Sequence, residues 1–112
     1  MTTRQIKTEE TDIIRHLLSI AKDSRANLPL PKMIEVLDDG KMGSIKLSTE
    51  KDTKYAKDIS AVEYTDSDNV LVVITLTEDN KGELFELDFW KTDFAELITY
   101  PVPEKVRVHA DT

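Results

Sequence analysis

The sequence predicts an α+β fold in which one N-terminal amphipathic helix packs on an antiparallel sheet of about five strands. Two observations lead to this prediction. Apolar residues recur at helical spacing near the N-terminus, and strand-like segments separated by turn residues fill the second half. Because 112 residues is the usual size of one domain, residues 1–112 are expected to form a single α+β domain.

The helix is expected over residues 9–23. Thr8 is a suitable N-cap, and the acidic residues that follow it complement the positive end of the helix dipole. Apolar side chains then recur on one face, at Ile13, Ile14, Leu17, Leu18 and Ala21. Pro29 and Pro31 prevent the helix from continuing, because proline lacks a backbone donor and restricts the residue before it.

A hairpin and a meander are expected to form the sheet. The hairpin joins residues 33–37 to residues 42–47 around a turn that contains Asp39-Gly40. The polar segment 48–57 is predicted as a loop or a short exposed helix. The meander has three strands, bounded by turn-forming residues, at 59–65, 70–77 and 83–90. A short helical turn capped by Thr92 or Asp93 and an irregular tail are expected after it.

The register of the meander determines which side chains face the helix. If Leu76 lies opposite Phe85, an apolar face packs under the helix and the other face is exposed. With Asn69 in the left-handed conformation, the first meander strand places Val62 and Tyr64 in the core. The exposed face then holds Glu63, Glu86 and Asp88. A register slip of the first strand would instead turn Glu63 inward.

Composition limits the classes of function. The chain contains no cysteine, which excludes disulfides, thiolate metal sites and thiol nucleophiles. The sequence contains no apolar run of the length of a signal peptide or a membrane span, so a cytoplasmic location is expected. Residues 1–57 hold eleven Lys/Arg and nine Asp/Glu, whereas residues 58–112 hold four and thirteen. We therefore expect a basic protein surface as the partner, and no direct nucleic acid or membrane partner.

The sequence contains no established catalytic or metal-binding motif. His16 and His109 lie outside any such pattern, and the acidic clusters lack the spacing of an EF-hand loop. Glu86 and Asp88 are paired carboxylates, but residues two apart on a strand share a face without forming a pocket. We expect no catalytic residue, metal, cofactor or small-molecule substrate. Trp90 is expected to cover the core at the end of its strand, and the alternative is a binding hot spot, where tryptophan is also enriched.

Two segments of the sequence resemble a known family of proteins. Residues 86–97 (ELDFWKTDFAEL) and residues 39–45 (DGKMGSI) resemble a family of small uncharacterised bacterial domains of similar length. Such short, acidic, cysteine-free domains are similar in style to the immunity proteins encoded beside polymorphic or contact-dependent growth inhibition toxins. The resemblance implies a protein that binds and neutralises a toxin, and it carries over no functional residue.

Three hypotheses of function follow. The first is an immunity protein whose acidic surface covers the basic active site of a cognate toxin, such as a nuclease. The second is a non-catalytic structural or regulatory module that binds another partner protein. The third is an enzyme that uses paired acids, and it lacks a nucleophile, a metal motif and a cofactor loop. For the first hypothesis the expected contact residues are Glu63, Asp66, Asp68, Glu78, Asp79, Glu86 and Asp88.

Overall fold

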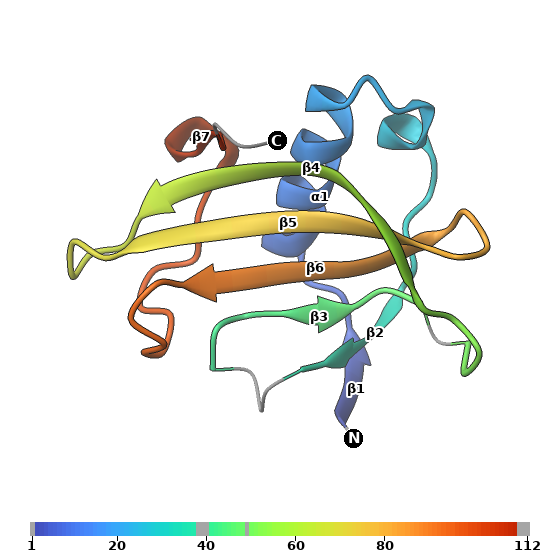
Figure 1. Cartoon of the computed structure of the whole chain (residues 1–112), viewed down its shortest axis with the longest axis horizontal. Coiled ribbons are helices and arrows are strands. Elements are labelled where there is room, and N and C mark those ends of the chain that lie inside the picture. The colour runs from blue at the N-terminus through green and yellow to red at the C-terminus, as the bar shows by residue number, and fades with distance from the viewer. Residues whose placement is uncertain (1, 38–40, 49, 110–112) are drawn as a thin grey trace.

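The structure is a computed structural model that describes residues 2–37, 41–48 and 50–109. These residues form a seven-stranded antiparallel sheet with the strand order β1-β2-β3-β6-β5-β4-β7, and helix α1 covers one of its faces (Figure 1). The predicted α+β class is confirmed. The prediction of about five strands is wrong, because two short strands at the ends of the chain complete the sheet.

Helix α1 spans Thr8–Ile20, and its N-cap is Lys7 rather than the predicted Thr8. The Lys7 backbone N–H donates to the Glu10 carboxylate at 2.9 Å, so the first turn is capped by an acidic side chain from within the helix. The predicted apolar face is confirmed, except that Ala21 follows the helix and is exposed. Its fully buried side chains are Ile13, Ile14, Leu17 and Leu18. A short 3-10 helix, η1 (Ser24–Asn27), follows.

The three central strands are β4 (Tyr55–Thr65), β5 (Leu71–Asp79) and β6 (Leu84–Lys91), and they confirm the predicted meander. Strand β4 begins earlier than predicted, inside the segment expected to be a loop or helix. The predicted register of this strand is confirmed: Glu63 lies opposite Val73. The turn before β5 contains Asn69 in the left-handed conformation, with φ 67°.

The pairing of β5 with β6 differs by two residues from the prediction. Leu76 lies opposite Leu87 rather than Phe85. The shift has a local cause: a bulge lies between Leu76 and Glu78, and the turn closes with the Asp79 N–H donating to the Glu83 carbonyl. Because side chains alternate with a period of two, Leu87 and Phe89 still face the core as predicted. Beyond the bulge the prediction is wrong: Leu84 is in the core, and Phe85, which was expected there, lies outside it beside the Lys46 ammonium.

The predicted hairpin is confirmed as the antiparallel pair β2 (Met33–Val36) and β3 (Ile45–Lys46), with Val36 opposite Ile45. The predicted Asp39-Gly40 turn lies outside the described residues.

The sequence did not predict the two edge strands. Strand β1 (Thr2–Gln5) pairs with β2, and β7 (Arg107–Val108) pairs with β4 after the 3-10 helix η3 (Pro103–Lys105). The helical turn expected after β6 is absent from residues 92–97, where the structure has turns and irregular backbone. Phe94 in this segment has φ 63°, which is incompatible with a right-handed helix.

The core lies between α1 and the inner face of the sheet. The Ser60 hydroxyl on β4 donates to the Leu17 carbonyl of the helix at 2.7 Å, and the buried side chains around this contact are aliphatic and aromatic. In Figure 1 the helix lies behind β4 and β5, so the view looks onto the opposite side of the sheet. We call this side the outer face, and no described helix covers it. None of the described helices is long and apolar enough to cross a membrane.

Candidate functional site

The outer face is formed by alternate residues of neighbouring strands. Directly paired residues point to the same side of a sheet, so the pairing defines rows of side chains across this face. Three rows are Glu35, Lys46 and Glu86; then Ala61, Thr75 and Asp88; then Glu63, Val73 and Trp90. Carboxylates therefore lie in all three rows.

Glu35, Glu86 and Asp88 lie close enough to influence one another electrostatically. Glu86 is half-buried, and this burial, followed by the charges of Asp88 and Glu35, raises its pKa above the ordinary value, although Lys46 acts in the opposite direction. Asp88 accepts a long hydrogen bond of 3.4 Å from the Ser44 hydroxyl. Like charges that lie together on a sheet weaken the fold, so this cluster is a candidate for a binding role.

Trp90 lies on the outer face, opposite Val73 and two positions along β6 from Asp88. The prediction that it covers the core is wrong. Strand alternation turns Phe89 inward, where it is 2% exposed, and turns Trp90 outward, where it is 47% exposed. An exposed tryptophan beside carboxylates is typical of a binding hot spot. We call Glu35, Glu86, Asp88 and Trp90 the acidic patch.

Glu63 lies on the predicted face but is engaged within the chain. Its carboxylate contacts His109 at 2.9 Å and Arg107 at 2.7 Å. The hydrogen bond with His109 and the charge of Arg107 lower the pKa of Glu63. Part of its negative charge is therefore balanced before any partner arrives.

Asp66 and Asp68 form an ion-pair cluster with Lys91 inside the protein. The Lys91 ammonium lies 3.0 Å from Asp66 and 2.7 Å from Asp68, and the side chains of Lys91 and Asp66 have no exposed surface. Asp66 also accepts the backbone N–H groups of Ile98 and Thr99 at 2.9 Å. Burial opposes ionisation of Asp66, but the hydrogen bonds outweigh it and lower its pKa to about 2. Asp66 thus fixes the segment after β6 and is inaccessible to a partner.

Glu78 and Asp79 end strand β5, and Glu78 lies opposite Leu84 at the start of β6. Glu78 forms an ion pair of 2.7 Å with Arg25 of η1. Asp79 is 1% exposed and accepts the backbone N–H groups of Lys81 and Glu83 within its turn. The structure thus brings together Glu86 and Asp88 from the expected contact set, places Glu63 on the same face, and engages the other acids in internal contacts.

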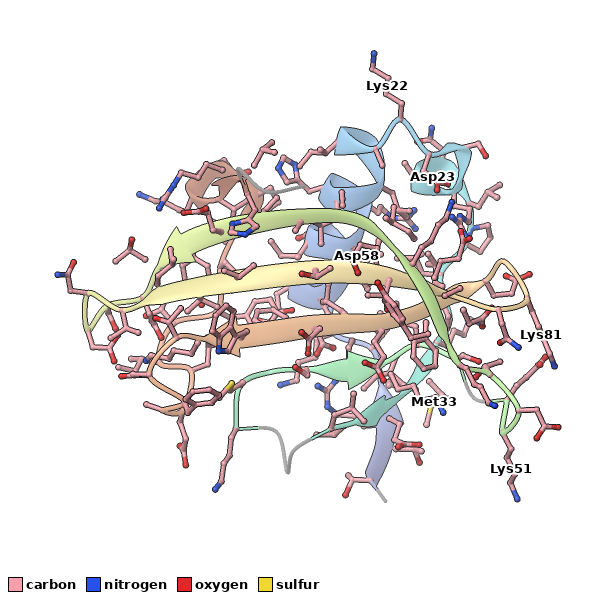
Figure 2. All side chains as sticks on the ribbon, in the orientation of Figure 1. Lys22, Asp23, Met33, Lys51, Asp58 and Lys81 are labelled. Carbon is pink, nitrogen blue, oxygen red and sulfur yellow. The ribbon has the colours of Figure 1, made fainter. Side chains whose placement is uncertain are left out.

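Two acids of the outer face were missed by sequence reasoning. Glu35 follows buried Ile34 on β2, and the alternation of this short strand already indicates that Glu35 points away from the core. Asp58 lies opposite Thr77 and accepts a hydrogen bond of 2.9 Å from the Tyr55 hydroxyl. It lies on the viewer's side of the sheet in Figure 2. No periodic signal marks Asp58, because two bulges interrupt this part of β4.

Comparison with known proteins assigns the chain to one family. The family is described as a domain of unknown function (DUF6984), and its profile matches residues 3–101. The chain belongs to the DUF6984 family. No curated protein and no solved structure matches the chain. The match agrees with the predicted resemblance to a small uncharacterised domain, and it extends over β1–β6 and α1 of this DUF6984 member.

The two segments that carried the resemblance contact each other in this DUF6984 member. The Leu97 N–H donates to the Lys41 carbonyl at 2.9 Å. Gly43 has φ 93°, a backbone conformation that side-chain-bearing residues rarely adopt, and a Cβ there would lie 3.5 Å from Leu97. The two segments therefore form one structural unit beside β6.

Replacing Glu86 with glutamine is expected to stabilise the fold by about 0.5 kcal/mol at pH 7, because it removes a charge that burial and the charges of Asp88 and Glu35 disfavour more than Lys46 favours it. The folded-state pKa of Glu86 is raised, so the stability conferred by its protonated form is present at low pH and is lost as pH rises through that pKa. Urea denaturation at pH 7 and at pH 3 measures the effect. The gain should shrink at pH 3, and a loss of stability at pH 7 would show that Glu86 supports the fold.

Proposed function

We propose that the protein is a non-catalytic immunity protein that binds a cognate bacterial toxin in the cytoplasm and covers a basic surface of it with the acidic patch. The main support is the grouping of Glu86 with Asp88 and Glu35 on the outer face. Burial of Glu86, followed by the charges of these two neighbours, raises its pKa. A basic partner would relieve this repulsion. Half-exposed Trp90 lies on the same strand and supplies apolar contact area.

The mode of action follows from charge and position. An acidic surface accelerates encounter with a basic partner and places carboxylates where a nuclease would hold phosphate groups. Sheet residues hold these carboxylates in fixed positions, since Glu86, Asp88 and Trp90 all lie on β6, which is paired on both sides. Binding of this kind needs no chemistry from the bound protein.

A role in binding fits the placement of the paired carboxylates better than a role in catalysis. Glu86 and Asp88 are two positions apart on one strand, and they lie on the open outer face rather than on the side covered by α1. Acid–base catalysis by a carboxyl pair requires both groups to converge on a substrate, usually within a pocket. Neighbouring positions on one open strand do not provide that arrangement.

The experiment is co-purification with the product of the neighbouring gene, followed by rescue of growth when that product is expressed. We expect a stable complex and rescue. Absence of both would contradict the proposed function.

The acidic patch itself is tested with the double variant Glu86→Gln/Asp88→Asn. Its association rate with the toxin should fall roughly tenfold at low salt, and the difference should shrink at high salt. The matched control is Asp52→Asn/Glu104→Gln, which removes two charges from exposed residues outside the patch. Equal rates for the two double variants would show that the patch is not the interface.

A further inference from the structure

The segment that follows β6, residues 92–98, displays large apolar side chains to solvent. Phe94 is 74% exposed, the highest value for a large hydrophobic side chain among the described residues, and Ile98 is 61% exposed. Half-exposed Trp90 precedes them near the end of β6. We call residues 92–98 the 92–98 loop, and in Figure 1 it leaves the arrowhead of β6. Exposed apolar side chains that are grouped in this way mark interaction sites more often than scattered ones do.

Phe94 also has a strained backbone. Its φ of 63° lies in the left-handed region, where glycine is favoured and a bulky side chain is an outlier. The Phe94 N–H donates to the Lys91 carbonyl at 2.8 Å and closes a turn, so the Cα atoms of these two residues lie within about 7 Å of each other. Phe94 is therefore close to the end of β6, where Trp90 lies. Because its ring is mostly exposed, packing within the chain offsets little of this strain, and an external contact explains the residue better.

Contacts with the buried ion-pair cluster hold the 92–98 loop in place. The Lys91 ammonium donates to the Glu96 carbonyl at 3.0 Å, and Asp66 accepts the Ile98 N–H at 2.9 Å. The side chain of Leu97 packs against the core between these two contacts. A loop that is fixed before binding loses little conformational entropy when a partner covers it. The exposed side chains of the loop are therefore presented in positions that favour binding.

The charges of the 92–98 loop indicate which partner it fits. Asp93 and Glu96 are exposed on either side of Phe94 in the chain, and residues 92–98 contain no lysine or arginine. The loop therefore carries the same sign of charge as the acidic patch, and one partner with a basic surface can contact both. A second copy of this chain, with its net charge of −7, would instead bring like charges together. Burial of the projecting Phe94 ring requires a concave apolar site on the partner.

We propose that the 92–98 loop is a second part of the toxin-binding surface, in which Phe94, together with Ile98, enters an apolar pocket of the toxin that is rimmed by basic side chains. This inference rests on the proposed function, because it assigns further contacts to the same partner. The two parts of the surface act on different rates. The acidic patch accelerates association, and burial of the Phe94 ring slows dissociation.

The test compares Phe94→Gly and Phe94→Ala in the full chain, with the co-purified product of the neighbouring gene as the binding partner. Both variants remove the ring and should bind roughly tenfold more weakly, mainly through faster dissociation. Only glycine adopts the positive φ without steric cost, so Phe94→Gly should melt at a higher temperature than Phe94→Ala and no lower than the wild type. Weaker binding by a variant that keeps full stability cannot result from a damaged fold.

The matched control is Lys22→Gly. Lys22 has φ 54°, follows α1 and projects into solvent (Figure 2), so this variant relieves the same kind of strain away from the 92–98 loop. Its affinity should equal that of the wild type. If Phe94→Gly binds as tightly as the wild type, the loop is not part of the interface, and the proposed role of the acidic patch is unaffected. If the wild-type chain forms no complex, the proposed function fails and this inference fails with it.

Discussion

Replacing Asp66 with alanine is expected to lower the free energy of unfolding by about 3–5 kcal/mol, the usual cost of removing one partner from a buried ion pair. Asp66 and Lys91 have no exposed surface, and their charged atoms lie 3.0 Å apart. The substitution leaves the Lys91 ammonium with Asp68 and the Glu96 carbonyl, and it removes the acceptor of three backbone N–H groups. Urea denaturation at pH 7 measures the loss.

Two further variants test whether the loss of the buried carboxylate beside Lys91 causes this decrease in stability. Asp68→Ala leaves the Asp66–Lys91 contact intact. Because the Asp68 side chain is 32% exposed, this variant should lose less stability than Asp66→Ala. The double variant Asp66→Ala/Lys91→Met removes both charges and should be more stable than Asp66→Ala alone. If the double variant is less stable than Asp66→Ala, the buried lysine supports the fold for another reason.

The helix and the meander could be predicted because each has a clear period. Ile13, Ile14, Leu17 and Leu18 recur at helical spacing, and all of them are buried. The meander strands alternate, and for that reason the core positions of Leu87 and Phe89 were correct although the register of β6 was wrong by two residues and Phe85 lies outside the core. The bulge that causes the shift depends on the contacts of the folded turn.

The edge strands and the buried lysine could not be predicted because they depend on contacts between distant residues. Strand β1 is short and polar, and it is held by pairing with β2 and by the contact of Arg4 with Glu10. Lys91 occupies an inward position after Leu87 and Phe89, where alternation predicts an apolar residue. Only the turn before β5, which brings two aspartates to Lys91, makes a charge acceptable there.

The candidate site also depends on contacts between distant residues, which the sequence does not reveal. Net charge showed that the second half is acidic, but a count of carboxylates does not separate exposed acids from buried ones. Asp66 and Asp79 were expected contacts and are buried, whereas Glu35 lies in the less acidic half and points outward beside Lys46. Alternation along a strand identifies the facing direction of Glu86 and Asp88. It does not identify ion pairs within a turn.

Replacing Trp90 with alanine is expected to weaken toxin binding by about 2–4 kcal/mol, roughly 30- to 1000-fold in affinity, which is the range of an aromatic hot spot. This prediction rests on the proposed function. Trp90 is 47% exposed on the outer face, so a partner can bury its ring. Calorimetric titration of the purified complex measures the change, and denaturation of the free variant should show a smaller effect on stability.

Tyr55→Ala is the matched control, because Tyr55 is also an exposed aromatic, at 57%, but begins β4 at the opposite end of the sheet from Trp90. Its affinity should equal that of the wild type. Trp90→Phe retains part of the apolar area and should fall between the wild type and Trp90→Ala. If Trp90→Ala binds as tightly as the wild type while Glu86→Gln/Asp88→Asn binds more slowly, the partner is attracted by the charges of the acidic patch without contacting the indole. The interface would then lie nearer to Glu35 and Lys46 than to the end of β6.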